Sequence, residues 1–245
     1  MRNITLKGHL EMENSKKLLY YAIDILEEGS VSLNNWSIGG GTILANTYNH
    51  RMSKDIDVFL NDAQQLSSLS PRFNSKSENA LDYNEMSQYI SLTFPEGKVD
   101  FIVGPQITNF PAEKQQFLGR EVRLDDPVEI VSKKIYFRGN QVLPRDVFDL
   151  AVVYNSDRKQ DLIRTICAMP DKMKVFTDAF AKQIQNSDFQ TYSTAYADML
   201  LPGGKFLQGK EICICRQLIE EIQIELNKTW GPKRKGKIKY VNRYR

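Results

Sequence analysis

The stretch from Gly39 to Leu60 limits the possible folds of this chain more than any other. Three consecutive glycines lead into a short apolar run, and a segment of alternating acidic and apolar residues follows. Alternate side chains of a strand point to the same face, so Asp55 and Asp57 share one face. The opposite, buried face is formed by Ile56, Val58 and Leu60. The stretch therefore predicts a strand, a glycine turn, a short helix that begins near Thr42, and a second strand that carries two carboxylates.

The two carboxylates and the glycine turn together favour a site for phosphate chemistry. The Cα atoms of Asp55 and Asp57 are expected roughly 6–7 Å apart, and Mg²⁺ prefers hard oxygen ligands of this kind. Two-metal phosphoryl-transfer sites hold their ions about 3.5–4 Å apart. The turn Gly39–Gly41 lets backbone N–H groups approach a phosphate closely, and a helix that starts near Thr42 presents its positive end to the same anion. Without the glycine turn, two acids at the end of a strand would more often be simply solvated.

Composition places the chain among ordinary globular proteins. Its 245 residues suit one large domain or two small ones, and hydrophobic and charged residues make up 41% and 26%. Because no apolar run is long enough to cross a membrane and the first residues do not resemble a signal peptide, we expect a cytoplasmic protein without a membrane partner. Its three cysteines predict neither a disulfide framework nor a zinc site.

The segments around the first block alternate between helix-like and strand-like patterns. Apolar residues at helical spacing predict a packing helix over 13–28, and 34–38 reads as the strand that enters the glycine turn. A helix and a variable loop are expected over 61–84. Two β-rich runs, 88–94 and 98–103, flank a Pro/Gly loop and predict a hairpin. Asp100 is the single acid of the second arm, and on its own it marks only the solvated face of that strand.

The chain changes from strand-like to helical composition at Asp125. Asp126 at the N-cap position, followed by Pro127 and Glu129, is a strong start signal for a helix. On this helix Lys134 and Arg138 share a face, because they are four residues apart. Lysine and arginine on a helix are usually surface charges, so the spacing alone assigns them no function. Asp146 and Asp149 face together on the next helix, and its buried stripe is formed by Val147, Leu150, Ala151 and Tyr154.

Two sequence blocks together resemble a known enzyme family. The first is Gly-Gly-x-Thr followed by His-Arg-x-Ser-x-Asp-Ile-Asp-x-Phe, and the second runs from Glu129 through Arg138 to Arg145-Asp146. They resemble the nucleotidyltransferases of the DNA polymerase β superfamily and, within it, the AbiEii type, the toxin of abortive-infection and type IV toxin–antitoxin systems. The resemblance covers residues 36–154. It departs from the wider superfamily at Thr42, where a glycine-serine pair is common, and at Ser53, which lies two residues before Asp55 rather than one.

The resemblance implies roles for residues that the pattern alone leaves open. Asp100 matches a third strand carboxylate that completes the metal site and can act as base toward the acceptor hydroxyl. Lys134 aligns better than Lys133 with a lysine that binds the nucleotide triphosphate, and an Arg-Asp helix closes the site. Both Asp146 and Asp149 are candidates for the aspartate of that helix, and we favour Asp146 because it belongs to the Arg-Asp pair.

Three sets of residues describe the expected site. The ligands of two Mg²⁺ ions, or of Mn²⁺ in their place, are expected to be Asp55, Asp57 and Asp100. The catalytic residues are expected to be Asp55, Asp57, Asp100, Lys134 and Asp146. The NTP substrate is expected to bind at Gly39, Gly40, Gly41, Thr42, Ser53, Lys134 and Arg138. For His50 a structural role at the end of the helix is expected, and Arg51 either contacts phosphate or pairs with a carboxylate.

The rest of the chain carries no catalytic signature. Helices are expected over 157–169, 171–185, 188–201 and 209–228, with a Pro-Gly-Gly break at 202–204. The last residues, 232–245, include seven Lys and Arg and no acid, so the positive net charge of +3 belongs to this basic tail. The tail is either a solubilising end or a contact for nucleic acid.

The expected fold class is therefore α/β (α+β). A minimal nucleotidyltransferase domain with a mixed sheet and flanking helices spans 1–124, a helical domain spans 125–231, and the tail follows. The expected reaction moves an NMP from an NTP to an acceptor hydroxyl, on an RNA such as tRNA or on a protein, with a cognate antitoxin as a further partner. Two alternatives are a non-catalytic nucleic-acid-binding module on a decayed transferase fold and a metal-dependent nuclease. Three retained acids argue against the first, and the glycine turn argues against the second.

Overall fold

The computed structural model describes residues 6–197 and 199–230, so the basic tail lies outside the described residues. Within this part of the chain, the strands form one mixed sheet in the order β3-β4-β5-β2-β1-β7-β6. The strands are β1 (Trp36–Gly39), β2 (Ile56–Leu60), β3 (Asp82–Met86), β4 (Tyr89–Phe94), β5 (Gly97–Val103), β6 (Glu113–Phe117) and β7 (Arg120–Leu124). Strand β2 pairs parallel with β5, and β1 pairs parallel with β7, whereas the other neighbours are antiparallel. The predicted α/β class with a mixed sheet is confirmed.

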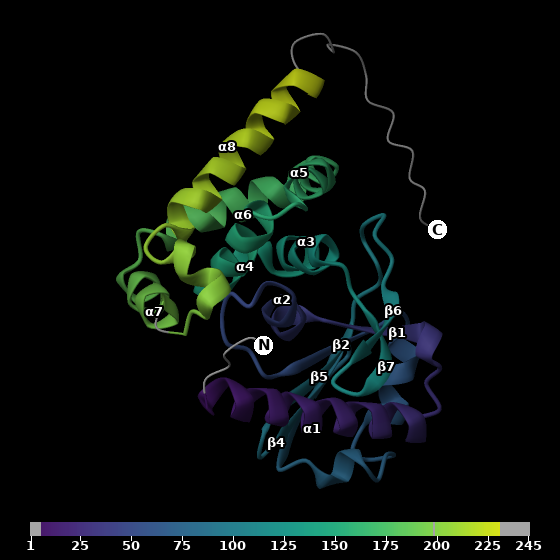
Figure 1. The fold of residues 1–245 in the computed structure, drawn as a ribbon. Helices are drawn as coiled ribbons and strands as arrows, with labels where there is room; N and C mark the ends of the chain where they lie inside the picture. Colours follow the sequence, from purple (N-terminus) through teal and green to yellow (C-terminus); the bar gives the residue numbers. More distant parts are fainter. Residues whose placement is uncertain (1–5, 198, 231–245) are drawn as a thin grey trace.

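Helices cover the sheet on both faces. The α-helices are α1 (Leu6–Glu28), α2 (Gly40–Tyr48), α3 (Pro127–Arg138), α4 (Pro144–Tyr154), α5 (Lys159–Cys167), α6 (Pro170–Gln183), α7 (Ser187–Ala197) and α8 (Glu211–Trp230). Short 3₁₀ helices are η1 (Leu33–Asn35), η2 (Ala63–Leu69), η3 (Ser77–Asn79), η4 (Gly139–Gln141) and η5 (Pro202–Leu207). Helix α1 crosses one face, α2 and α3 lie on the other, and α4 to α8 stack beyond them (Figure 1). None of these helices combines the length and the apolar composition that a membrane crossing requires.

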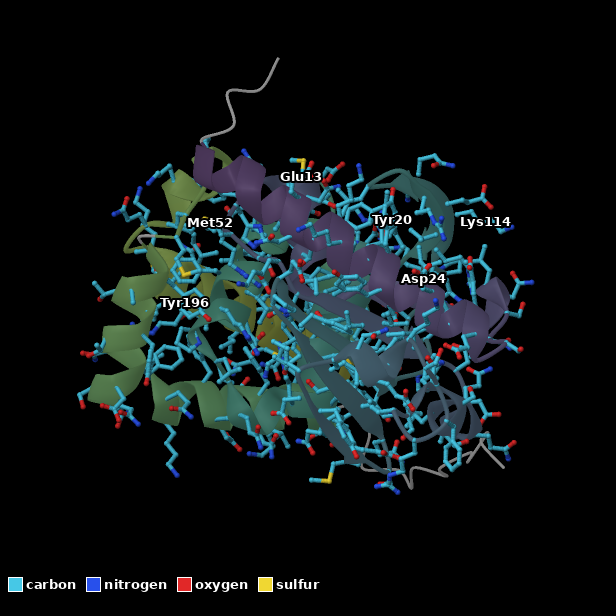
Figure 2. All side chains as sticks on the ribbon, turned by 90° about the horizontal axis from the view of Figure 1, so that it is seen from below. Glu13, Tyr20, Asp24, Met52, Lys114 and Tyr196 are labelled. Atoms are coloured by element: carbon cyan, nitrogen blue, oxygen red, sulfur yellow. The ribbon has the colours of Figure 1, made fainter. Side chains whose placement is uncertain are left out.

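The two faces of β2 explain where the core and the polar side chains lie. On one face Ile56, Val58 and Leu60 are fully buried, and α1 packs against this side of β2 and β5. Figure 2 shows α1 lying along the sheet, with Glu13, Tyr20 and Asp24 along its length. The odd-numbered residues of β2, Asp57 and Phe59, therefore point to the face that α2 and α3 cover. The alternation predicted from the sequence thus separates an apolar core from a polar face.

Some elements differ from the sequence-based expectation. Helix α1 begins earlier than residue 13, and α2 begins at Gly40 rather than near Thr42. The region 61–84 holds two 3₁₀ helices and the start of β3 rather than an α-helix and a loop. The hairpin of β6 and β7 was not predicted because the residues of β6 are mostly polar and exposed, as in an edge strand. The start of α3 is as predicted, because the Asp126 carboxylate accepts a hydrogen bond of 2.8 Å from the Val128 N–H.

The Pro-Gly-Gly sequence at 202–204 is a point of close packing and not only a break between helices. Backbone hydrogen bonds join it and the residues just before it to the segment after α2: Gly203 N–H donates to the Asn49 carbonyl, and Met52 N–H donates to the Met199 carbonyl. A Cβ atom on Gly204 would lie 2.0 Å from the His50 carbonyl oxygen. Only glycine allows this approach, so the C-terminal half of the chain holds the segment that leads into β2. The domain boundary at residue 124 stays a prediction.

We predict that Gly204→Ala destabilises the protein by roughly 1–3 kcal/mol, because backbone atoms on both sides must move apart to admit the methyl group. Urea denaturation of the variant and the wild type measures the effect. Gly139→Ala is the matched control, since its Cβ would meet no atom closer than 3.4 Å. Equal stability of the Gly204 variant and the wild type would show that the two segments are not tightly packed.

Candidate active site

Asp57 and Asp100 lie side by side at the centre of the sheet. They are register partners on the parallel strands β2 and β5, and both point to the face that α2 and α3 cover. An oxygen of the Asp100 carboxylate accepts a hydrogen bond of 2.5 Å from the Ser91 hydroxyl on β4. Ser91 was not predicted, although the hairpin register places it directly opposite Asp100. The sheet therefore brings together two of the three predicted carboxylates.

Asp55 lies just before β2 and is held differently. One oxygen of its carboxylate accepts a hydrogen bond of 3.0 Å from the backbone N–H of Lys98, at the start of β5. Within residues 6–197 and 199–230, no group of three His, Cys, Asp or Glu side chains is arranged to hold a metal ion. Asp55, Asp57 and Asp100 nevertheless line one cavity, so the ligand set stays a prediction.

The electrostatics of the acidic pair nevertheless suits a divalent cation. Burial, followed by repulsion from Asp100, raises the pKa of Asp57 to about 6. Burial also raises the pKa of Asp100, against the opposing effect of the Ser91 hydrogen bond. Two adjacent carboxylates that are costly to ionise provide the hard oxygen ligands and the negative charge that Mg²⁺ requires. Asp57 and Asp100 therefore fit a divalent cation, and the Asp55 carboxylate has a second oxygen besides the one that accepts from the Lys98 N–H.

The glycine turn allows charged side chains to pack against the backbone. Gly40 has a φ angle of +74°, and a Cβ on it would lie 1.7 Å from an oxygen of the Asp57 carboxylate. A Cβ on Gly41 would lie 2.4 Å from a terminal nitrogen of Arg51. Gly39 instead packs against Asp125 and Phe59. Because Gly40 and Gly41 have no side chain, the Asp57 carboxylate and the Arg51 guanidinium can pack against the backbone of the turn.

Thr42 and Ser53 connect the start of α2 to the residues before β2. The Thr42 hydroxyl donates a hydrogen bond of 2.5 Å to the Asp55 carbonyl oxygen and lies 3.1 Å from the Ser53 hydroxyl. The Thr42 side chain therefore positions the backbone that carries Asp55. Ser53 lines a cavity beside Asp55, where its hydroxyl can meet a ligand.

A buried network of charges lies next to the acids. The Lys134 ammonium group is 2.8 Å from Asp146 and 2.9 Å from Asp149, and Arg138 donates to the same Asp146 carboxylate. Burial alone would raise the pKa of Asp149, but Arg51 and Lys134 hold it well below its usual range. Asp146 and Asp149 are both buried and both hold Lys134, so the structure gives each of them a positioning role.

Arg51 and His50 belong to this network and bind the same carboxylate. Arg51 donates to the two oxygens of Asp149, at 2.8 and 2.9 Å, and its side chain is almost fully buried. Of the two alternatives for Arg51, pairing with a carboxylate is the one found. Nε2 of His50 lies 2.7 Å from Asp149, and burial lowers the pKa of this histidine. Both residues thus tie the segment after α2 to helix α4.

Lys133 differs from Lys134 in its partners. Its ammonium group is 2.8 Å from Asp125 and 3.3 Å from Glu129, and it lies 4.1 Å from the centre of the Phe59 ring. Through these contacts the Lys133 side chain helps to hold α3 against the sheet. Lys134 and Arg138 line both cavities beside Asp57, whereas Lys133 lines only the larger of these two. The choice of Lys134 from the family resemblance stays a prediction.

Two cavities meet at the acidic pair. Their volumes are about 760 Å³ and 460 Å³, and we call them the larger and the smaller cavity. Both are lined by Asp57, Asp100, Ile102, Lys134 and Arg138. Met52 and Tyr196, which lie near one another in Figure 2, line the smaller cavity together with Lys54 and Arg145. Sequence reasoning did not assign Lys54 or Tyr196 to the site, because only the close packing of residues 199–203 on residues 49–52 brings them together.

We predict that Asp57→Asn stabilises the metal-free protein at pH 8 by on the order of 1–3 kcal/mol. The folded-state pKa of about 6 exceeds the ordinary value of 3.8, so the ionised carboxylate opposes folding at high pH. The gain should shrink as the pH falls from about 6 through 3.8, because the wild-type carboxyl is protonated in both states only below its unfolded pKa. Urea denaturation in the presence of a chelator measures it. Asp24→Asn, on the exposed side of α1 (Figure 2), is the control, and a loss of stability at pH 8 would contradict the prediction.

A profile of the family described as "Nucleotidyl transferase AbiEii toxin, Type IV TA system" matches residues 24–205. No curated protein sequence matches the chain. Two solved structures are similar at low identity. A putative nucleotidyltransferase from H. pylori has 14% identity and a TM-score of 0.47, over 88% of this chain and 96% of that chain.

The second similar structure is MenT4, a nucleotidyltransferase toxin from Mycobacterium tuberculosis, with 14% identity and a TM-score of 0.44. The match covers 89% of this chain and 92% of that chain. The family match includes the acidic pair, the glycine turn and the charged network on α3 and α4. The chain therefore belongs to the AbiEii family of nucleotidyltransferase toxins.

Proposed function

We propose that this protein transfers an NMP from an NTP to an acceptor hydroxyl, on an RNA such as tRNA or on a protein, with Mg²⁺ as cofactor. The observation that carries the proposal is the half-buried pair Asp57 and Asp100 at the junction of two cavities, with Lys134 and Arg138 lining both. A bound divalent cation would neutralise the phosphate oxygens and polarise the α-phosphorus. Asp57 and Asp100 would hold it, with Asp55 as a third ligand.

The side chains of the smaller cavity suit a triphosphate. Lys54 and Arg145 line it, and within the described part of the chain neither forms an ion pair. The Nε of Arg138 is buried without a hydrogen-bond partner among the described residues. Gly41 and Ser53, beside the start of α2, add a backbone N–H and a hydroxyl near the positive end of a helix. Together these donors would fix the β- and γ-phosphates while the α-phosphate faces the acids.

The reaction that fits these residues is an in-line displacement. The acceptor hydroxyl oxygen forms a bond to the α-phosphorus, the bond from that phosphorus to the bridging oxygen breaks, and pyrophosphate leaves. Asp100 can accept the hydroxyl proton, because its pKa is raised and it lies beside Asp57. Lys134 and Arg138 offset the negative charge that develops on the leaving pyrophosphate.

The biological role follows from the family. We propose that the protein acts as a toxin in a type IV toxin–antitoxin or phage-defence system and that a cognate antitoxin restrains it. Incubation of the purified protein with each labelled NTP, Mg²⁺ and total RNA or total protein identifies the acceptor. A protein that bound RNA but labelled no macromolecule with any NTP would instead be a binding module on a decayed transferase fold.

We predict that Asp57→Asn lowers the rate of NMP transfer by roughly a thousandfold, because a neutral amide removes several kcal/mol of charge stabilisation. The folded state should persist, which circular dichroism checks. Mg²⁺ binding to the wild type should lower the pKa of the Asp57 carboxyl, which NMR can follow. This measurement does not depend on catalytic turnover. Near wild-type transfer by the variant would exclude this carboxylate as a metal ligand.

We predict that Lys134→Ala raises the KM for NTP at least about tenfold and changes the KM for the acceptor little, because only the triphosphate requires a cation there. The fold should survive, since Asp149 keeps Arg51 and Asp146 keeps Arg138 as partners. Steady-state kinetics with each substrate varied in turn measures both constants. Lys133→Ala is the matched comparison, and an effect on NTP confined to that variant would assign the role to Lys133.

A further inference from the structure

The smaller cavity is lined by two chemically different kinds of side chain. Lys54 and Arg145 are among its cations, whereas Met52, Tyr196 and Met199 give it an apolar surface. Its volume of about 460 Å³ lies in the range of small-molecule sites. A ligand that fills this cavity must therefore offer both anionic groups and an apolar surface.

The apolar residues come from two segments that backbone hydrogen bonds hold together. Met52 N–H donates to the Met199 carbonyl at 3.0 Å, and Leu201 N–H donates to the His50 carbonyl at 3.0 Å. Figure 2 shows Met52 and Tyr196 near one another. Met52, Tyr196 and Met199 therefore form one cluster, which we call the apolar wall of the smaller cavity.

The packing of α7 holds Tyr196 at this wall. Phe189 and Ser193 are buried, and Tyr196 continues their row at helical spacing. The Ser193 hydroxyl donates a hydrogen bond of 2.7 Å to the buried carboxylate of Glu211, at the start of α8. Tyr196 itself is only half-buried, so part of its surface remains free for a ligand in the cavity.

We infer that the apolar wall binds the nucleobase of the donor NTP and that the Tyr196 ring stacks on this base. The inference rests on the proposed function, because it places a second part of the donor in the cavity that would hold the triphosphate. Every base has a face that can stack on an aromatic ring, so the contact adds affinity without selecting one base. The flexible side chains of Met52 and Met199 can fit bases of different size. Tyr196 thus adds affinity for the nucleoside, and the cations add affinity for the triphosphate.

The test compares an NTP with a triphosphate that has no base, and it needs no turnover. The nucleotide probes are NTP analogues with a methylene bridge between the α- and β-phosphates, one for each of the four bases. Tyr196→Leu should weaken the binding of all four by about tenfold, as expected for the loss of one stacked base. Binding of inorganic tripolyphosphate should not change. Isothermal titration calorimetry in the presence of Mg²⁺ measures both affinities.

Three further variants control the measurement. Tyr196→Phe should bind the analogues as the wild type does, because the ring is retained. Tyr192→Leu is the matched control, since this ring on the same helix is 62% exposed and lines neither of the two cavities. Met199→Ala removes a different part of the apolar wall, and it should also weaken binding of the analogues but not of tripolyphosphate. Circular dichroism confirms that each variant is folded.

The outcomes separate the inference from the proposed function. Unchanged binding of the analogues by Tyr196→Leu would overturn the inference. An equal loss of affinity for the analogues and for tripolyphosphate would also overturn it, because Tyr196 would then support the phosphate site and not the base. A loss confined to Phe137→Leu would place the base in the larger cavity instead. If the wild type binds the analogues through Tyr196 but transfers no NMP from any NTP, the proposed function fails and the inference stands.

Discussion

The buried carboxylate of Asp149 is the point on which the arrangement of this site depends. It binds Arg51 through two hydrogen bonds and also contacts His50 and Lys134. These partners come from the segment after α2 and from α3, so one side chain on α4 connects three parts of the chain. Removing Asp149 would leave the buried Arg51 without its carboxylate partner, and breaking a buried ion pair in this way typically costs about 3–5 kcal/mol. The network therefore fixes Lys134 beside the acids before any substrate binds.

The cations of the site have partners of opposite charge, whereas the acids Asp57 and Asp100 lie beside each other. Lys134 and Arg138 already have Asp146 as a partner, whereas Asp57 and Asp100 face each other across neighbouring strands. Lys134 and Arg138 are therefore held in place by Asp146. Ionising both Asp57 and Asp100 costs free energy, and the pKa of Asp57 is raised for this reason. A site that keeps such a cost in its resting state is suited to a positively charged ligand, and the proposed divalent cation would remove the cost.

Close backbone packing sets the shape of the two cavities. Gly40 brings the carboxylate of Asp57 against the turn, and Gly204 brings the C-terminal half against His50. Through the second contact, Tyr196 and Met199 become part of the smaller cavity. The helical half is thus more than a support, because it completes the wall of the proposed triphosphate site. The larger cavity is lined by residues of β3, β4, β5 and α3, and no described residue after Arg138 lines it.

The sequence by itself determined the elements that local chemistry specifies. Alternation in β2 assigned Asp57 to the face opposite Ile56 and Val58, and Asp126 with Pro127 marked the start of α3, because strand period and helix capping are short-range effects. The family resemblance favoured Lys134 over Lys133 as the predicted triphosphate-binding lysine. Only the tertiary structure decided that Arg51 pairs with Asp149, that the Asp55 carboxylate accepts from Lys98, and that Lys54 and Tyr196 line one cavity. These contacts join residues far apart in the chain, so their formation depends on how the sheet and helices pack.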